Sequence, residues 1–407
     1  MRTLPTRLLA AALVLPLALA GCSNDKSKSP TANPGGGGGS AAAGNPVKVM
    51  LIYDETGSGA APELVDGANA GLARVNANGG INGRPVELTV CKTGNDPNTA
   101  DNCARQAQSL GVAAVVGELT LQKGHEKILR EAKIPIIGAV TSGTDLAEVA
   151  QFPLDGSTPI QTASLANALA AQGFKKISMA RIQIDGGGAF SGFANQGLTS
   201  ANQKILNDVP VPTGAADMAP YVQAVLANGT DAILTVLPGT DSTAFIKQLK
   251  KDNPNIAIGI IGTQKEKVAD ALGTASDGLY EALGYLPPAY PNTATKNFVA
   301  DMSKLGFSET RGFRLNAYAA VLAFAEAAKK AKEPTSAALW DALPTMSGID
   351  IGLTPPIQWT KGNVGGYPRI FTSCAFIVKY SGGKELPVYD TFRDAYTGQN
   401  CTTPAKS

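Results

Sequence analysis

Short apolar runs alternate with longer amphipathic stretches along most of the chain, beginning with the apolar run Val47–Tyr53. From Glu63 to Asn78 the apolar positions recur with the 3.6-residue period of a helix, and Gly79 and Gly80 follow, as glycine often does past a helix end. The same reasoning extends over the rest of the chain. It predicts strands at 47–53, 86–91, 113–117, 134–139, 176–182, 232–237 and 256–261, and helices at 63–78, 100–110 and 122–132.

Strands that alternate with helices indicate parallel sheets covered by helices on both faces, the doubly wound α/β architecture. The length from Val47 to Ser407 exceeds one ordinary domain, so we expect two such α/β lobes. Ligands of doubly wound sheets bind outside the carboxyl ends of the strands. Binding residues are therefore expected in the turns that directly follow the strands, where Gly, Ser, Thr and Asp are frequent in this chain.

Residues 1–21 predict an export signal. Arg2 and Arg7 precede the apolar run Leu8–Ala20, which is shorter than the roughly twenty residues that a membrane-spanning helix needs. The run ends in Leu19-Ala20-Gly21-Cys22, which looks like a bacterial lipobox, so we expect cleavage before Cys22 and lipidation of its thiol. The alternative is an ordinary secretory signal followed by a chance cysteine.

Residues 22–46 are expected to form the lipidated cysteine and a flexible linker rich in Ser, Pro and Gly. A glycine-rich loop cradles phosphate only where it joins a strand to a helix, and no strand precedes these glycines. The linker would hold an extracytoplasmic domain on the outer face of the bacterial cell membrane.

The charges argue against one class of partner. Outside the predicted signal, basic and acidic residues are equally numerous, because Arg2 and Arg7 account for the formal net charge of +2. No basic stretch is interleaved with aromatic residues. Nucleic acid is therefore not expected as a partner.

Four cysteines remain after Cys22, an even number that suits disulfide bonds in an oxidising compartment. Four cysteines allow three pairings, and we prefer Cys91–Cys103 with Cys374–Cys401 because each pair is close in sequence. Each bond would stabilise the fold by roughly 3–4 kcal/mol. A metal site is the alternative use of the cysteines, but the chain has no Cys-x-x-Cys pair and only one histidine, so no metal or other cofactor is expected.

Catalytic chemistry would leave traces that the sequence lacks. His125, the only histidine, falls at the expected exposed start of a helix, which favours a surface side chain over a catalytic one. Neither a G-x-S-x-G elbow nor a G-x-x-x-x-G-K-[ST] loop occurs. The chain is therefore not expected to be an enzyme.

Several motifs occur in an order that resembles one protein family. They are Gly67-Ala68, the segment from Val75 to Leu88, Gly117, Ile134-Pro135-Ile136, Asp277-Gly278-Leu279 and Pro355-Pro356-Ile357-Gln358-Trp359-Thr360-Lys361-Gly362. This set resembles the leucine/isoleucine/valine-binding family of substrate-binding proteins, which serve ABC importers, and the likeness runs from Val47 to about Tyr380. It implies two lobes joined by three crossing segments, near Asp155, Gly284–Pro287 and Gly348–Thr354.

The resemblance also implies how the chain divides between the lobes. The first lobe would comprise residues 47–155 and 287–347, and the second lobe would comprise residues 156–286 and 348–401. The composition of residues 402–407, and not the resemblance, predicts a disordered tail.

Relatives hold the main-chain groups of an amino acid mostly with loops of the first lobe. The matching candidates are Leu119 and Gln122 after the third strand, Val140, Thr141 and Ser142 after the fourth strand, and Asp155 at the first crossing. The hydroxyls of Thr141 and Ser142 suit a carboxylate, and Asp155 suits a cation. The alternatives are that Thr141 and Ser142 cap the next helix and that Asp155 is a turn residue.

The sequence departs from the family pattern at three candidate contacts. Relatives often carry two hydroxyl residues where this chain has Leu121-Gln122, an acidic residue where it has Gln264, and an aromatic residue where it has Pro238, with Asp241 close by. We include Gln264 and Asp241 among the binding candidates. A branched-chain or related amino acid is the leading ligand, and an amide, a urea-like compound or another small polar metabolite is the alternative.

The resemblance implies delivery of the ligand to an ABC permease of the branched-chain amino acid type by hinge closure of a monomer. A sensor that docks on a receptor or kinase, and a lipid-anchored hydrolase, are the competing interpretations.

Overall fold

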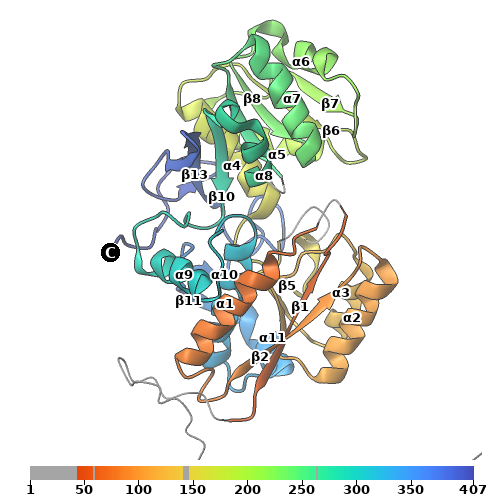
Figure 1. Ribbon diagram of the computed structural model, residues 1–407, viewed down its shortest axis with the longest axis vertical. Coiled ribbons are helices and arrows are strands. Elements are labelled where there is room, and N and C mark those ends of the chain that lie inside the picture. Colours follow the sequence, from red (N-terminus) through yellow and green to blue (C-terminus); the bar gives the residue numbers. More distant parts are fainter. Residues whose placement is uncertain (1–43, 58–59, 141–145, 263–264) are drawn as a thin grey trace, which may run out of the picture. The chain divides into compact units, whose positions relative to one another are not determined.

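The computed structural model describes residues 44–57, 60–140, 146–262 and 265–407, and Figure 1 shows their helices and strands. The strands are β1 (Val47–Tyr53), β2 (Val86–Lys92), β3 (Ala114–Val116), β4 (Ile136–Ile137), β5 (Gln151–Phe152), β6 (Ile177–Ile182), β7 (Asp208–Val211), β8 (Ala232–Val236), β9 (Ala257–Ile261), β10 (Leu279–Leu283), β11 (Ser347–Ile349), β12 (Ile357–Gln358), β13 (Cys374–Ser381), β14 (Lys384–Pro387) and β15 (Arg393–Asp394).

The helices are α1 (Leu64–Ala77), α2 (Pro97–Leu110), α3 (Gly124–Glu131), α4 (Ser157–Ala171), α5 (Ala189–Leu198), α6 (Ala219–Leu226), α7 (Gly239–Asp252), α8 (Lys265–Leu272), α9 (Thr293–Lys304), α10 (Arg314–Lys330) and α11 (Ser336–Ala342). Each strand and helix predicted from the sequence has a counterpart among these elements, with ends displaced by a few residues.

The first sheet has the strand order β2-β1-β3-β4-β5, and every neighbouring pair is parallel. Successive side chains of a strand point to opposite faces, and both faces of β1 are buried. Val49 and Leu51 pack with α1, α9 and α10, whereas Met50 and Ile52 pack with α2 and α3. The sheet is therefore covered by helices on both sides, as its apolar strands predict.

The second sheet has the order β14-β13-β10-β9-β8-β6-β7, with β15 paired to β13. Strands β6 to β10 pair in parallel, and β13 adds to them antiparallel. In β8, Leu234 belongs to the hydrophobic cluster that includes α4 and α5, and Ile233 belongs to the cluster that includes α6, α7 and α8. The predicted fold class, two doubly wound parallel-sheet units, is confirmed.

The chain passes between the two sheets three times. The first passage follows β5 and the second follows β10. The third passage differs from the prediction near 348–354, because Ile349, Leu353 and Trp359 pack in the core of the first sheet and β11 pairs with β12. The chain returns to the second sheet only between Trp359 and Cys374.

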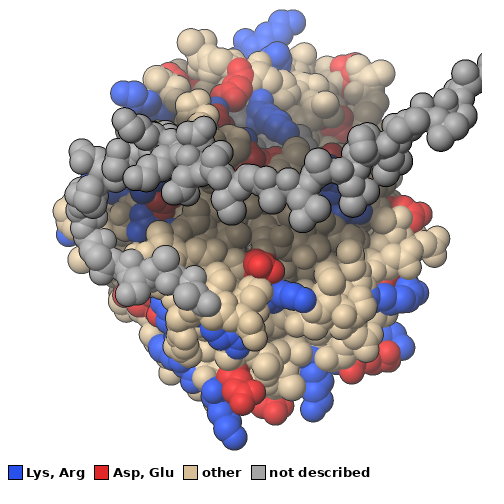
Figure 2. Space-filling model, turned by 60° about the horizontal axis from the view of Figure 1, so that its bottom comes forward, with Lys and Arg blue, Asp and Glu red and all other residues tan. Residues whose placement is uncertain are grey.

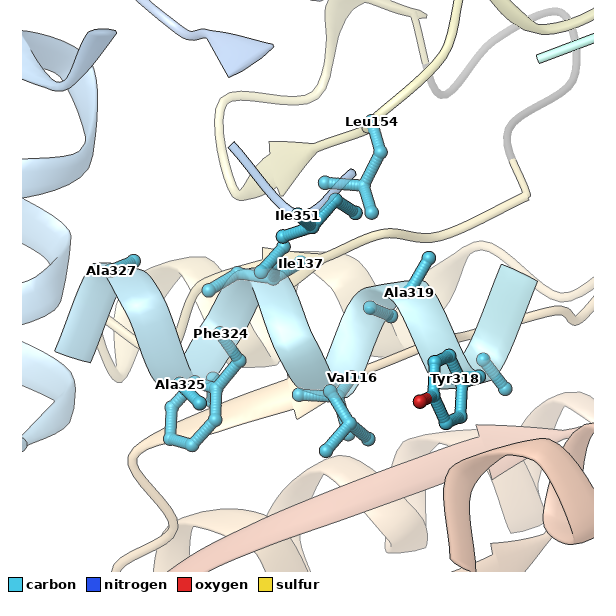
Figure 3. Close-up of a cluster of buried hydrophobic side chains, with 14 of the residues drawn as sticks. Val116, Ile137, Leu154, Tyr318, Ala319, Phe324, Ala325, Ala327 and Ile351 are labelled. Carbon is cyan, nitrogen blue, oxygen red and sulfur yellow. The ribbon is translucent and has the colours of Figure 1, made fainter. Parts of the chain in front are cut away.

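Helix α10 is the central support of the first sheet, and Figure 3 shows its buried side chains against Val116, Ile137, Leu154 and Ile351. Small residues allow the close approach of α1 and α10. A Cβ atom added to Gly67 would lie 1.9 Å from the carbonyl oxygen of Arg314, so only glycine fits there.

Both predicted disulfide bonds are present, with Cα–Cα distances of 5.8 Å for Cys91–Cys103 and 6.3 Å for Cys374–Cys401. The first bond joins β2 to α2, and the second joins the start of β13 to the C-terminal segment. Each unit of the fold therefore carries one covalent cross-link.

The prediction that residues 402–407 are disordered is wrong. The backbone N–H of Ser407 donates to the carbonyl of Pro291 at 2.8 Å, and the side chain of Lys406 pairs with Asp390 at 3.3 Å. These contacts hold the tail against the segment before α9. The ring of Tyr290 adds a further contact, because it lies under the Lys406 ammonium.

None of the helices in the described ranges is both long enough and apolar enough to cross a membrane. The face drawn in Figure 2 carries basic and acidic side chains interspersed among uncharged ones. This mixture agrees with the balanced charge of the sequence.

Candidate functional site

A pocket of about 180 Å³ lies where strand ends of both sheets meet. From the first sheet it is lined by Leu119 after β3, Val140 after β4 and Asp155 after β5. From the second sheet it is lined by Gly262 after β9 and Tyr285 after β10. All five follow the carboxyl ends of parallel strands, which is where doubly wound sheets bind ligands.

The first-sheet wall of the pocket is held by Asp54, a fully buried residue that follows β1. Its carboxylate accepts hydrogen bonds from the hydroxyls of Thr93 and Thr120 and, at 2.9 Å, from the backbone N–H of Leu121. These bonds fix the loop after β3 and turn Leu119 and Leu121 toward the pocket. The described part of this wall is mainly apolar.

Asp155 brings a buried carboxylate to the floor of the pocket. It accepts hydrogen bonds from the backbone N–H of Ser157 at 3.0 Å and from the Ser157 hydroxyl at 3.2 Å. Burial raises the pKa of Asp155 above its usual range, although the bonds from Ser157 and the charge of Lys265 oppose the shift. The group can accept a cation or, once protonated, donate a hydrogen bond.

Two neighbours fix the position of Asp155. A Cβ atom added to Gly284 would lie 2.2 Å from the carboxylate, so the glycine makes room for Asp155. On the other side, Trp359 donates from its indole nitrogen to the carbonyl of Pro153 at 3.1 Å and meets Phe152 edge to face. The carboxylate is therefore held by packing as well as by hydrogen bonds.

The second-sheet wall carries charged side chains. The ammonium of Lys265 pairs with Glu281 at 2.6 Å, and both side chains are largely buried. The hydroxyl of Tyr380 lies 3.0 Å from Glu281 and 3.2 Å from Glu385. Burial and the charge of Glu281 raise the pKa of Glu385 to about 7. A single hydroxyl proton cannot serve both carboxylates, so protonation of Glu385 would supply the second hydrogen bond of this network.

Arg311 closes one side of the pocket. Its guanidinium pairs through two nitrogens with Asp270 on α8, at 2.9 and 3.1 Å, and with Glu309 beside it. The Arg311 guanidinium lowers the pKa of Glu309 to about 2. Arg311 therefore joins the segment before α10 to a helix of the second sheet.

The structure brings some of the predicted binding residues together and separates others. Leu119, Val140 and Asp155 line the pocket. Gln122 does not, because its side-chain amide donates to Asn95 at 2.9 Å, and Asp241 instead accepts from the backbone N–H of Gly214 at 3.1 Å. The candidates Thr141, Ser142 and Gln264, and the lipidation candidate Cys22, lie outside the described residues.

Sequence reasoning missed Lys265, Glu281, Tyr380 and Glu385. One signal could have found Glu281, because it is the single charged residue inside the otherwise apolar strand β10, and buried charges are rare unless they are paired. Its partners come from distant parts of the chain and give no comparable signal.

The prediction that His125 is an exposed surface residue is wrong. The side chain is buried because the start of α3 turns it under the loop after β3, where its ring nitrogen meets Glu118.

The chain is similar in sequence and in structure to known proteins. A family model described as periplasmic binding protein matches residues 46–384. The chain belongs to the periplasmic binding protein family. Its fold is the type I periplasmic binding fold, as the sequence motifs predicted. The family comprises solute-binding proteins of ABC transporters, which act outside the cytoplasm, pass a small molecule to a permease and are not enzymes.

Solved structures support the fold. The branched-chain amino acid transporter substrate-binding protein from Streptococcus pneumoniae, in complex with isoleucine, is 19% identical, with a TM-score of 0.67 over 83% of this chain and 97% of that chain. The fatty acid ABC transporter substrate-binding protein from Thermomonospora curvata is 17% identical, with a TM-score of 0.71 over 89% and 97%.

A third similar structure is an ABC transporter solute-binding protein from R. palustris in complex with 4-hydroxybenzoate. It is 17% identical, with a TM-score of 0.67 over 84% of this chain and 95% of that chain. The search of curated proteins gives no significant match.

Proposed function

We propose that this periplasmic binding protein captures a branched-chain or related amino acid and delivers it to an ABC permease of the corresponding type. One observation carries the proposal: the pocket combines a buried carboxylate, Asp155, and a largely buried ammonium, Lys265, with an apolar first-sheet wall. An amino acid with an apolar side chain offers an ammonium for Asp155, a carboxylate for Lys265 and a side chain for the apolar wall.

The two charged groups line the same pocket of about 180 Å³. The charge of Lys265 acts on Asp155, where it opposes the rise in pKa caused by burial. Ionised hydrogen-bond partners in a largely dry site bind more strongly than in water. The ligand ammonium would meet Asp155, its carboxylate would meet Lys265, and its side chain would lie against Leu119 and Val140. The hydroxyls of Thr141 and Ser142 remain predicted partners of the carboxylate.

A carboxylic acid without an amine is the second candidate. The raised pKa of Asp155 favours it, because a protonated Asp155 would not attract an ammonium. The similar proteins from Thermomonospora curvata and R. palustris are a fatty acid transporter component and a 4-hydroxybenzoate complex. Those ligands share a carboxylate with isoleucine, and Lys265 would serve it in either case.

A thermal-shift screen of the purified full chain tests both candidates. Leucine, isoleucine and valine should be compared with 4-methylpentanoate, which keeps the leucine skeleton and the carboxylate but lacks the amine, and with benzoates, amides and polyols. A ligand at 100 times its Kd stabilises the folded state by about 2.7 kcal/mol, enough to raise the melting temperature measurably. Stabilisation by 4-methylpentanoate without stabilisation by any amino acid would replace the leading proposal with the second candidate.

Two substitutions locate the ligand. Asp155→Asn should weaken binding of an amino acid at least tenfold and leave binding of an amine-free acid unchanged, because only the amino acid presents an ammonium. Lys265→Ala should weaken both. Lys267→Ala, an exposed residue on the same helix, is the matched control and should change neither. Equal affinity in wild type and Lys265→Ala would refute the placement of the carboxylate.

We further propose that the protein works as a monomer tethered by lipid on Cys22. The sequence supports this through the Leu19-Ala20-Gly21-Cys22 motif and the glycine-rich stretch that follows. Labelling of growing cells with a fatty acid should introduce lipid into the wild-type protein and none into Cys22→Ser. Retention of label in that variant would refute the tether.

A further inference from the structure

A buried group of metal-ligating side chains lies behind the first-sheet wall of the pocket. Glu118, His125 and Glu126 each offer one ligand atom, and these atoms lie within 4.8 Å of one another. Glu118 follows β3, while His125 and Glu126 belong to the first turn of α3. Neither the solute-binding pocket nor the hydrophobic core uses these three groups.

Burial distinguishes this cluster from an ordinary acidic surface. The exposed fraction is 3% for Glu118, 1% for His125 and 7% for Glu126. Two carboxylates and one neutral imidazole together form a donor set of charge −2, which a divalent cation neutralises. Nitrogen and oxygen donors of this kind suit zinc, which binds imidazole at about 2.0–2.1 Å and carboxylate at about 2.0–2.2 Å.

A fourth side chain borders the cluster and could change its role when an ion binds. Gln151 of β5 is 1% exposed, and its amide reaches into the cluster, with Nε2 lying 3.1 Å from both Glu118 and Glu126. Its Oε1 atom is buried without a hydrogen-bond partner. A half-turn of the amide exchanges the two atoms and would place Oε1 between the carboxylates. That orientation is repulsive toward two carboxylates alone and favourable once a cation lies between them.

We propose that Glu118, His125 and Glu126 bind one divalent transition-metal ion, with Gln151 as a supporting ligand, and that zinc fits the site. The ion would replace the proton that Nε2 of His125 shares with Glu118, and these two atoms, which now lie 2.5 Å apart, would separate to admit it.

The position of the site gives the ion a structural effect. Leu119 directly follows Glu118 and lines the pocket, and the carbonyl of Glu118 accepts from the backbone N–H of Val140 at 2.9 Å, another lining residue. An ion bound to Glu118 therefore stiffens two segments of the first-sheet wall. This effect does not depend on which solute the pocket binds.

The presence of a single histidine makes the test direct. The full chain, purified without a histidine tag and treated with EDTA, should be labelled with ¹⁵N-histidine and titrated with zinc chloride. Zinc should move the Nε2 resonance of the one imidazole and saturate at one ion per chain, while magnesium should leave it in place. An imidazole spectrum that does not respond to zinc overturns the proposal, and this result needs no variant to fold.

Calorimetry of variants gives the second test. Glu126→Gln should weaken zinc binding at least tenfold. Removal of a residue that only supports a ligand typically lowers metal affinity about 10–100-fold, and removal of a direct ligand should lower it at least as much. The matched control is Glu131→Gln on the same helix, where Glu131 is exposed and pairs with Lys127, and it should bind zinc as wild type does. If Glu126→Gln and wild type bind zinc with equal affinity, the ion binds at another site and the proposal is wrong. The four disulfide-bonded cysteines cannot supply thiolates.

Discussion

The first sheet presents the apolar side chains of Leu119, Leu121 and Val140 to the pocket beside the carboxylate of Asp155, whereas the second sheet presents Lys265, Glu281 and Tyr380. The first sheet also has charged groups at its strand ends, but Asp54 and the cluster around His125 do not line the pocket and instead bind the loop after β3. In the described part of the chain, charged and polar lining groups therefore come from both sides, with Asp155 and Arg311 on the first-sheet side and Lys265, Glu281 and Tyr380 on the second. The family resemblance had placed recognition mainly on the first lobe.

The same contrast applies to stability. The first sheet depends on close packing of small residues, as at Gly67 against α10. The second sheet combines packing with a network of ionised and protonated groups around Tyr380. Both tryptophans, Trp340 and Trp359, pack with clusters of the first sheet. Tryptophan fluorescence thus reports on the first sheet, and circular dichroism reports on both.

The largest effect is expected for Gly67→Ala. The added methyl group would overlap the carbonyl oxygen of Arg314, and moving α1 from α10 would open the core of the first sheet, so we expect a loss of at least about 4 kcal/mol in unfolding free energy. Urea unfolding followed by tryptophan fluorescence measures it. Gly188→Ala, where a methyl group meets no atom within 4 Å and φ is −60°, should be neutral. A neutral Gly67→Ala would show that packing does not limit the first sheet.

Removal of one disulfide at a time should make the unfolding transitions of the two sheets distinguishable. Replacing Cys91 and Cys103 by alanine should lower the fluorescence-detected stability by about 3 kcal/mol. Replacing Cys374 and Cys401 should lower the unfolding free energy by about 0.7 kcal/mol more, because this bond closes a longer loop. The sequence separation is 27 residues for Cys374–Cys401 and 12 residues for Cys91–Cys103. This second change should shift the circular dichroism transition ahead of the fluorescence transition. Coincident transitions in both variants would mean that the sheets unfold as one unit.

The smallest effect is a pH dependence located at Glu385. Its pKa is about 7 in the folded protein and 4.5 in an ordinary glutamate, so the folded state holds the proton more tightly. This stabilisation is complete below pH 4.5 and is lost as the pH rises through 7. Glu385→Gln removes the titrating group, so its stability relative to wild type should rise by about 1–2 kcal/mol between pH 5 and pH 8, discounted for partial exposure. Melting temperatures of both proteins at the two pH values measure this difference. An equal difference at pH 5 and pH 8 would contradict the raised pKa of Glu385.

The sequence was sufficient for the architecture because the fold follows local patterns. The run Val47–Tyr53 is buried on both faces and could only be an inner strand, and the helix from Leu64 has the period and terminal glycines that define its ends. The disulfides were predictable because each pair is close in sequence. These are short-range signals.

The pocket was only partly predictable because its charges meet over long distances. Asp155 was selected because the family resemblance placed it at the first crossing between the lobes, but Glu281 and Glu385 are brought together by Tyr380, a residue near the end of the chain. His125 was misassigned because the helical pattern does not show that the loop after β3 folds over the start of α3. Gln122 was selected for its position in the sequence, whereas its side chain is already used by Asn95.

The start of β1 has a mechanical consequence. The chain enters the first sheet at Val47, at the amino ends of the strands, and the seven residues of β1 span roughly 23 Å before the edge where the pocket begins. Tension applied ahead of Val47 would load β1 along its length, and the strand is flanked on both sides by parallel partners, β2 and β3. Their hydrogen bonds would therefore bear that load in shear together.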